Sequence, residues 1–490
     1  MADKLSQYMM NMMLRSVAWD SEMRLGSLTL SSLRFKIGET EEILSVIADM
    51  LDALSSVALT CGEKIDLFVH FSSIYQHNGE IRNLCNSLLV SAFEPVGEFI
   101  FGVIYEGKVK DPYCEFFIDE NFVQTSTVPV FLLNVSESIL ECGKIARILG
   151  SVLDEPMVVP ACDASMLLNG GANTFISGVL ASHNVKLDEI LRPSIEKSLK
   201  LVRNIFFISK SNWFMDFITS GDLEKPVTDI SLIKVNSWLR SAIIDNTGEL
   251  QGQFHTFSLD QINTQNIEES EGVLGIRAFT IDWRTEYPIN TIFTESMVFK
   301  LQCIFRHLFY CKCVDLKLSA LWLDFQASRG DVNSTSLLPS NLLLQEMIHF
   351  IKNYLFYLSI DVIETKTASL DIHKHTVFEF SEKFDSILSE IISEFNLTTQ
   401  VYKLLTKVLS TCALFSAHIR RFLALQTIDD SIAEVAQQER YISMFEKFRD
   451  AFQGQMNSLI IQLKLNRNTS SENLIARLDF NEYFSDIMGI

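Results

Sequence analysis

Four side chains between residues 303 and 313 could coordinate a metal ion: Cys303, His307, Cys311 and Cys313. Thiolate and imidazole groups are the ligands of structural zinc sites. If this segment forms one helix, however, residues 303 and 311 lie about 12 Å apart, at ~1.5 Å of rise per residue. Zinc–ligand bonds are about 2 Å long, so these two cysteines cannot share one tetrahedral ion. The spacing favours a packed helical face with a hydrogen-bonded His307, and we expect no metal.

Other patterns that could support catalysis are weak. His373 and His375 alternate around Lys374 in a polar stretch, which is typical of an exposed turn rather than of a ligand pair. The sequence contains no phosphate-binding glycine loop, no dinucleotide fingerprint, no nucleophile elbow and no zinc-protease motif. Because the chain has 61 acidic residues, pairs of carboxylates are expected by chance and do not identify a catalytic site. We therefore expect no catalysis and no cofactor. The alternative, an enzyme with an unrecognised helical site, would need a concave pocket with perturbed titratable groups.

Composition indicates a large helical protein whose partners are proteins. At 490 residues the chain exceeds the size of a single hydrophobic core, so two or more domains are expected. Nine prolines, 20 glycines and 48% hydrophobic residues favour long helices. The net charge of −20 and a pI near 4.9 oppose binding to nucleic acid or to anionic membranes.

Cysteine usage and terminal composition predict a cytosolic location. The nine cysteines are scattered and odd in number, which is typical of reduced core thiols. Asp3 and Asn11 make the N-terminus a poor secretory signal. The longest uncharged stretch, 164–185, contains glycines, asparagines and serines, so no membrane insertion is expected.

The segment that carries the cysteines has strong helical signals. Pro288 imposes an extended or turn geometry on Tyr287, Thr294 is a candidate N-cap, and Glu295 suits the first turn of a helix. Apolar residues then recur every three or four positions, interrupted by Asp315, and predict a long helix that packs against other helices. This stripe contains Leu301, Ile304, Leu308, Cys311, Leu318, Trp322 and Phe325.

Helical periodicity also runs through the rest of the chain. Three amphipathic segments, 41–59, 65–74 and 81–93, predict a helical bundle in the first ninety residues. Pro95 and Pro193 each suit the first turn of a helix. The helix that Pro95 begins is expected to end near Gly107, and the helix that contains Pro193 is expected to cover residues 190–207. Later helices are expected at 342–363 and, beyond that, around Phe384, Leu404 and Phe445. Loops are expected at 151–173, 246–275 and 327–339.

Taken together, segment 287–325 resembles the second conserved motif of the gamma-tubulin complex components, the subunits of microtubule-nucleating rings. Residues 305–312 are most similar to component two of that family. Segment 105–118, with Asp111-Pro112-Tyr113 at its centre, resembles the first family motif. Further segments match in the family's order at 128–149, 212–230, 348–355 and 475–484, although Ser211-Asn212 stands where relatives often carry Gly-Asp.

The resemblance implies an all-α fold, an elongated stack of helical bundles in two halves, 1–225 and 226–490. It implies that the first half makes lateral contacts with related subunits, including a component-three-type subunit, through Asp111, Pro112 and Tyr113. It implies that the second half binds gamma-tubulin at a microtubule-organising centre or spindle pole of the cytoskeleton. The residues assigned to that contact are Tyr287, Pro288, Arg306, His307, Arg477, Asp479 and Asn481.

Local alternatives exist for several of these residues. Asp111 and Pro112 could instead cap a helix and begin it, with Tyr113 as a packed aromatic. Arg306, Arg477 and Asp479 could form internal salt bridges that orient helices. Because about seventy residues precede Ile74, docking of small adaptors through an N-terminal arm is not expected. A rival class is the vesicle-tethering subunit, which is also acidic and helical.

Overall fold

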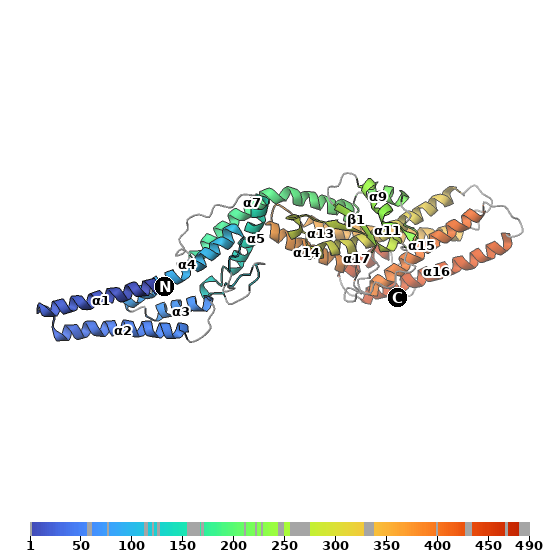
Figure 1. The fold of residues 1–490 in the computed structure, drawn as a ribbon. Coiled ribbons are helices and arrows are strands. Elements are labelled where there is room, and N and C mark those ends of the chain that lie inside the picture. Colours follow the sequence, from blue (N-terminus) through green and yellow to red (C-terminus); the bar gives the residue numbers. More distant parts are fainter. Residues whose placement is uncertain are drawn as a thin grey trace. The chain divides into compact units, whose positions relative to one another are not determined.

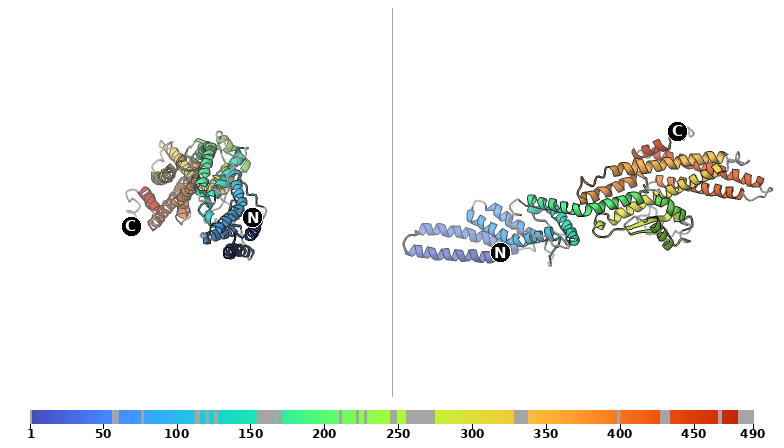
Figure 2. Two further views of the ribbon diagram at one scale, coloured as in Figure 1. Left: turned by 90° about the vertical axis from the view of Figure 1, so that its left-hand side faces the viewer. Right: turned by 90° about the horizontal axis from the view of Figure 1, so that it is seen from above.

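The computed structural model describes residues 2–55, 61–75, 78–111, 116–119, 122–124, 128–153, 167, 171–209, 212–220, 223–226, 229–243, 249–254, 275–327, 338–397, 400–426, 434–465 and 469–479. The chain divides into two compact units, Met1–Ile190 and Leu191–Ile490 (Figures 1 and 2). This division lies upstream of the expected boundary at residue 225. Helices dominate both units, so the predicted all-α class is confirmed.

Unit 1 opens with four helices; three of them contain the predicted amphipathic segments in their described residues, and the first was not predicted. They are α1 (Ala2–Arg24), α2 (Leu30–Ser55), α3 (Cys61–Ile74) and α4 (Gly79–Phe101). Buried residues of α2, among them Ile43 and Val46, pack in one cluster with Ile81 and Leu84 of α4. Asn78 caps α4 by accepting hydrogen bonds from the backbone N–H groups of Glu80 and Ile81. These contacts join the four helices into a bundle.

Helix α4 continues through Pro95 into the π-helix η1 (Gly102–Glu106), so the prediction that Pro95 begins a helix is wrong. Phe93 and Val96 on either side of it are buried in the core, and this packing outweighs the hydrogen bond that proline removes. The helix ends at Gly107 as expected. Gly107 has φ of 62°, and a Cβ there would lie 2.3 Å from the backbone N of Arg147, so only glycine fits.

The segment Gly79–Glu106 is also the one described helix long and apolar enough to cross a membrane. This finding rests on length and composition alone, and the core helices of folded domains meet the same criteria. Here the apolar residues Ile81, Leu88, Phe93 and Ile100 are fully or almost fully buried in the bundle.

Unit 1 is completed by η2 (Val130–Leu132), α5 (Ser136–Val152) and the first part of α7 (Ala172–Leu201), which leads into the π-helix η3 (Val202–Phe206). Pro193 lies inside α7, so the prediction that it begins a helix at 190 is wrong. Ile176, Leu187 and Ile195 are buried along α7. Their packing carries the helix across the proline from a start at Ala172.

Unit 2 contains a two-stranded sheet that the sequence analysis missed. β1 (Glu249–Phe254) pairs antiparallel with β2 (Phe279–Arg284), in a register that places Glu249 opposite Arg284. The expected loop at 246–275 is therefore wrong for β1. β1 is polar, and its pairing partner lies 25 or more residues along the chain, so local composition does not reveal it. Short helices flank the sheet: α8 (Asn212–Ser220), α9 (Leu232–Ala242), α10 (Gly275–Ala278) and η6 (Ile289–Thr291).

The central element of unit 2 is α11 (Glu295–Ala327). It begins where predicted, with Thr294 Oγ1 accepting a hydrogen bond from the N–H of Met297 at 3.4 Å. Residues of the predicted stripe are buried except Trp322, which is partly exposed. Burial extends beyond the stripe, because Phe305 and Phe309 on another face pack among the rings of Phe279, Phe214, Phe217 and Trp213.

The remaining helices of unit 2 follow α11 along the chain. They are α12 (Leu338–Phe356), the π-helix η8 (Tyr357–Glu364), α13 (Thr365–Ala368), α14 (Val377–Glu394), α15 (Gln400–Gln426), α16 (Glu434–Leu465) and α17 (Thr469–Leu478). Thr376 and Glu379 form a capping box at the start of α14. Helices α12, α14 and α15 pack directly on α11.

Candidate partner-binding site

The predicted site residues do not meet at one place in unit 2. Tyr287 is exposed and precedes η6, to which Pro288 is the N-cap, and the peptide bond between them is cis. Nearby, an open groove of about 970 Å³ follows β2, η6 and the first turns of α11, and its lining includes Asp282, Asn290 and Glu295. The lining mixes polar residues with apolar ones such as Trp283 and Phe293.

Arg306 and His307 lie inside the fold. His307 is 3% exposed, and its Nε2 is 2.7 Å from the hydroxyl oxygen of Tyr354. Burial, helped by the positive charge of Arg306, lowers the pKa of His307 to about 3, so the imidazole is neutral in the folded protein. Burial also lowers the pKa of Arg306. Both residues therefore support the core from α11, and direct contact of His307 with a partner would require the core to open.

The histidine and cysteines of α11 also behave as core groups. Cys311 Sγ lies 3.7 Å from His307 Nε2, and burial raises the pKa of Cys311 well above its usual range. Cys303 is buried as well, and desolvation raises its pKa to about 12. Protonated thiols are poor metal ligands. Within the part of the chain that the structure describes, no group of three or more His, Cys, Asp and Glu side chains could hold an ion.

Arg477 of α17 forms an ion pair with Asp361 of η8. Its Nε donates to Asp361 Oδ2 at 2.8 Å and its Nη2 donates to Oδ1 at 3.0 Å. The guanidinium also lies 4.3 Å from the ring centre of Phe356. Of the two alternatives for Arg477, the internal salt bridge is present. Asp479, which follows α17, is buried, and its N–H donates to the carbonyl of Ile475.

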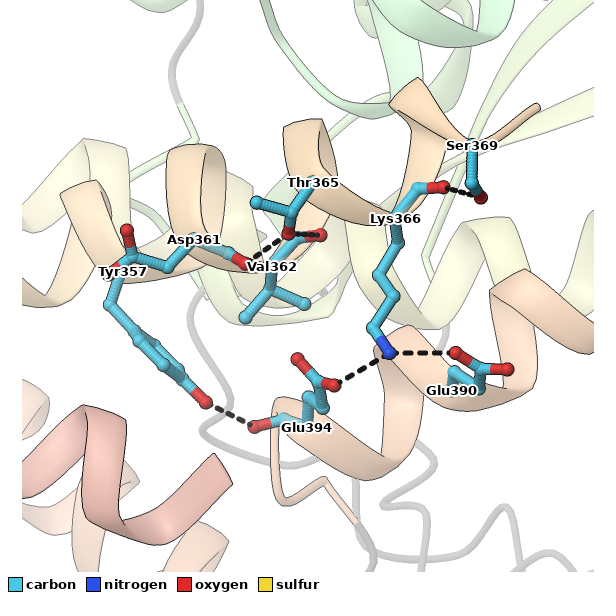
Figure 3. Close-up of polar contacts among 8 residues, drawn as sticks. All are labelled: Tyr357, Asp361, Val362, Thr365, Lys366, Ser369, Glu390 and Glu394. Carbon is cyan, nitrogen blue, oxygen red and sulfur yellow. Dashed lines mark hydrogen bonds and ion pairs between the residues drawn. The ribbon is translucent and has the colours of Figure 1, made fainter. Parts of the chain in front are cut away.

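A second set of contacts holds η8 and α13 on α14, as Figure 3 shows. Lys366 Nζ bridges Glu390 at 2.8 Å and Glu394 at 3.0 Å. Tyr357 donates from its hydroxyl to the backbone carbonyl of Glu394 at 3.3 Å. The π-helix η8 is thus joined to α14 through Tyr357 and to α17 through Asp361, and α13 is joined to α14 through Lys366. Beside it lies a groove of about 640 Å³ lined by His349, Asn353, Asp361, Thr365, Asn473 and Arg477.

The predicted lateral-contact motif is described only at its first residue. Asp111 Oδ2 accepts a hydrogen bond from the N–H of Phe116 at 2.7 Å. Pro112 and Tyr113 lie outside the described residues, as does Asn481.

The structure gathers four helix ends that the sequence analysis did not connect. Asp324 near the end of α11 pairs with Arg420 of α15 at 2.8 Å. Tyr441 near the start of α16 stacks on Phe422 of α15 and shares a hydrogen bond with Ser340 at the start of α12. These contacts bring the C-terminal ends of α11 and α15 together with the N-terminal ends of α12 and α16.

Large apolar side chains are exposed at this end of the four helices. Leu323 is 61% exposed and Leu342 is 62% exposed, and Trp322, Ile442 and Met444 are partly exposed nearby on the same helix ends. We call these five residues the apolar end of unit 2. The signal for it in the sequence is Leu323, an apolar residue outside the buried stripe of α11. Exposed apolar residues at the end of a rigid bundle are suited to contact with another protein.

Comparison with known proteins gives matches over nearly the whole chain. Residues 1–204 match the family profile described as "Gamma tubulin complex component N-terminal", and residues 196–484 match "Gamma tubulin complex component C-terminal". "Gamma-tubulin complex component 2" of Mus musculus is 22% identical over 84% of this chain and 51% of the relative.

Two further relatives agree with these profiles. "Gamma-tubulin complex component 2" of Arabidopsis thaliana is 23% identical over 70% of this chain and 57% of the relative. "Spindle pole body component alp4" of Schizosaccharomyces pombe is 20% identical over 89% of this chain and 69% of the relative. The chain thus spans about half the length of the mouse and Arabidopsis relatives.

Proposed function

Because the chain belongs to the gamma tubulin complex component family, we propose that it is a structural subunit of a gamma-tubulin complex, without catalytic activity. The family resemblance that the sequence predicts is confirmed, including the similarity to component two. The observation that carries the proposal is the pair of family profiles, which together cover residues 1–484 in the family's order. We place the subunit at a microtubule-organising centre or spindle pole.

Such a subunit would promote microtubule nucleation by ordering its partners in advance. A first ring of tubulin forms slowly from free dimers, because several associations must lose translational and rotational freedom before closure adds lateral contacts. A preassembled arc of subunits that each hold one gamma-tubulin removes this barrier. Added tubulin then meets a template at high effective concentration.

Residues 226–490 are proposed to bind gamma-tubulin, through the apolar end of unit 2. The rigid bundle around α11 holds Leu323 and Leu342 in position, and their exposure supports an apolar contact. The net charge of −20 argues against bulk charge attraction to another acidic protein. Raised salt should therefore weaken binding only modestly, since salt screens mainly exposed charge pairs.

Residues 1–225 are proposed to make the side-by-side contacts with related subunits, one of them of the component-three type. Asp111, Pro112 and Tyr113 remain the proposed lateral residues. Three further residues are proposed as secondary or positioning elements for gamma-tubulin: Tyr287 near its groove, Arg477 in the groove that it lines, and Asp479.

Purification of the tagged full chain from a cytosolic extract tests this proposal. We expect gamma-tubulin and at least one different family subunit to copurify in amounts comparable to the bait. Recovery of neither would contradict the proposed function.

A further inference from the structure

Helix α15 is a basic element in an acidic protein. Its 27 residues, Gln400–Gln426, include Lys403, Lys407, Arg420 and Arg421 and no aspartate or glutamate. The whole chain, by contrast, has 61 acidic residues against 41 lysines and arginines. The charge of α15 is therefore opposite to that of the chain as a whole, and an anionic ligand near this helix would be attracted locally.

Three of these cations lie on one exposed face of α15. Lys407 follows Lys403 by about one helical turn, and Arg421 follows Lys403 by about five turns, so the three side chains point in a similar direction. Leu414 lies on the same face and is 54% exposed. All four residues are exposed, and we call them the α15 row. The row extends along about 27 Å of the helix, at ~1.5 Å per residue.

The border of the row toward α16 carries no acidic side chain. Helices α15 and α16 run side by side (Figure 1). Thr411 Oγ1 donates to Gln455 Oε1 at 2.9 Å, and the ring of His418 lies 5.5 Å from the ring of Phe448. The exposed residues one helical turn from these two contacts on α16 are Met444, Ala451 and Ser458. This side of the row is therefore uncharged.

The border toward α11 adds a cation and a compensated carboxylate. Ser410 of α15 shares a hydrogen bond with the hydroxyl of Tyr310 at 3.4 Å, and the guanidinium of Arg277 lies 5.5 Å from the centre of the Tyr310 ring. Asp324 pairs with Arg420 at 2.8 Å, so Arg420 is not counted in the row. Among the residues that the structure describes, no ion pair involves Lys407 or Arg421. These two cations are thus open to an acidic ligand.

We propose that the α15 row binds an extended acidic segment of a partner protein, whose carboxylates meet Lys407 and Arg421 and whose central apolar side chain meets Leu414. A segment of about eight residues spans the row, at ~3.4 Å per residue. Arg421 precedes Phe422, which stacks on Tyr441, so the row leads to the apolar end of unit 2. The inference does not depend on gamma-tubulin being the partner.

Other sources of negative charge fit the row less well. A long nucleic acid is repelled by the net charge of −20, and its phosphate backbone offers no apolar partner for Leu414. The chain's own residues Glu268, Glu269 and Glu271 precede Arg277 in the sequence and are the intramolecular alternative. A short acidic segment of a partner satisfies both the cations and the exposed leucine.

The test uses the full chain and a fluorescently labelled eight-residue peptide of glutamates around a central leucine. Binding is measured by fluorescence anisotropy. We expect saturable binding that weakens at least about tenfold in the double variant Lys407→Glu with Arg421→Glu, since each change replaces an attraction with a repulsion. Raised salt should weaken the binding of the parent, because the cations are exposed. A peptide with glutamine in place of glutamate should bind at least about tenfold more weakly.

The matched control is the double variant Lys234→Glu with Arg240→Glu. Both residues are exposed on α9, which packs on α8 and β1, and the variant changes the net charge by the same amount. It should bind the acidic peptide as the parent does. Circular dichroism verifies that both double variants keep their helices. Equal losses in the two double variants would show a bulk charge effect and overturn the proposal, as would absence of binding by the parent.

Two further measurements separate the alternative occupants. The triple variant Glu268→Gln, Glu269→Gln and Glu271→Gln should bind the peptide as the parent does. Binding by this variant alone would mean that the chain's own acidic residues occupy the row, and would overturn the proposal. A single-stranded oligonucleotide of eight thymidines should bind at least about tenfold more weakly than the peptide. Equal or tighter binding of the oligonucleotide, lost in the row variant, would overturn the assignment to a peptide.

Discussion

Helices α2 and α11 are both long and apolar, yet they relate to their surroundings in opposite ways. α11 has packed side chains on several faces, including Leu301, Phe305 and Phe309, and is contacted by α12, α14 and α15. α2 uses one face for its bundle and leaves Leu30, Ile37, Leu44 and Leu51 exposed. Helix α11 is therefore held by its own domain on several faces, whereas α2 is held on one face and leaves a row of large apolar side chains exposed.

The largest difference should appear when one apolar side chain is truncated in each helix. Phe309→Ala leaves a cavity among several aromatic rings and should lower the free energy of unfolding by about 3–5 kcal/mol. Leu44→Ala, at a partly exposed site, should lower it by about 0.5 kcal/mol. Urea unfolding followed by far-ultraviolet circular dichroism measures both. Similar losses in the two variants would show that α2 is also part of a packed core.

Acidification should destabilise the surroundings of α11 through His307. The pKa of His307 is lowered by burial from 6.5 to about 3, so the unfolded state takes up its proton first as pH falls. The stability that the neutral imidazole provides is present above pH 6.5 and should decline by about 1.4 kcal/mol per pH unit between 6.5 and 3. Thermal unfolding at several pH values measures this decline.

The control for this prediction is the variant His307→Gln. It should be less stable at pH 7, but its free energy of unfolding should fall less steeply as the pH is lowered. Some dependence on pH should remain because of His183, whose pKa is lowered by burial to about 4. The variant His373→Gln replaces an exposed histidine of the turn before α14 and controls for the substitution of histidine by glutamine itself. An unchanged slope in His307→Gln would contradict the assignment.

The ion pair between Arg477 and Asp361 should contribute a smaller effect, because both side chains are partly exposed. A double-mutant cycle with Arg477→Met and Asp361→Asn should give a coupling free energy of about 1 kcal/mol. Arg477→Lys should recover only part of it, since lysine cannot make the bidentate contact or stack on Phe356 in the same way. A coupling near zero would mean that α17 is held by its apolar residues alone.

The smallest effect is expected in the hairpin of unit 1. Lys36→Met removes the exposed pair with Glu22 and should change the free energy of unfolding by less than about 0.5 kcal/mol. Urea unfolding measures this change, and a loss above about 1 kcal/mol would contradict the treatment of this pair as an exposed one.

Sequence reasoning was most successful where local signals and packing agree. The start of α11 follows from Thr294 and Glu295, and the end of η1 follows from Gly107, since each depends on a few neighbouring residues. The predictions that Pro95 and Pro193 lie in the first turn of a helix were wrong, because packing on both sides of each proline outweighs its helix-breaking tendency. β1 was missed because a polar strand depends on a distant partner.

The candidate site was harder to predict than the fold. Motif residues such as His307 were assigned to partner contact, but a motif shows that residue types recur without showing whether they face inward. The burial of His307 and the ion pair of Arg477 depend on α12 and η8, which lie far along the chain. The apolar end of unit 2 arises from four helix ends that meet only in three dimensions. The spacing of Leu30, Ile37, Leu44 and Leu51 on α2 is visible in the sequence, but their exposure is not.

The measurement that tests the central claim most directly is equilibrium binding of purified gamma-tubulin to the full chain. It compares the parent with two double variants, Leu323→Glu with Leu342→Glu at the apolar end of unit 2, and Ile37→Glu with Leu44→Glu at exposed positions of α2. We predict that the parent and the α2 variant bind equally, while the unit 2 variant binds at least about tenfold more weakly. Absence of binding by the parent, or equal binding by all three proteins, would contradict the account.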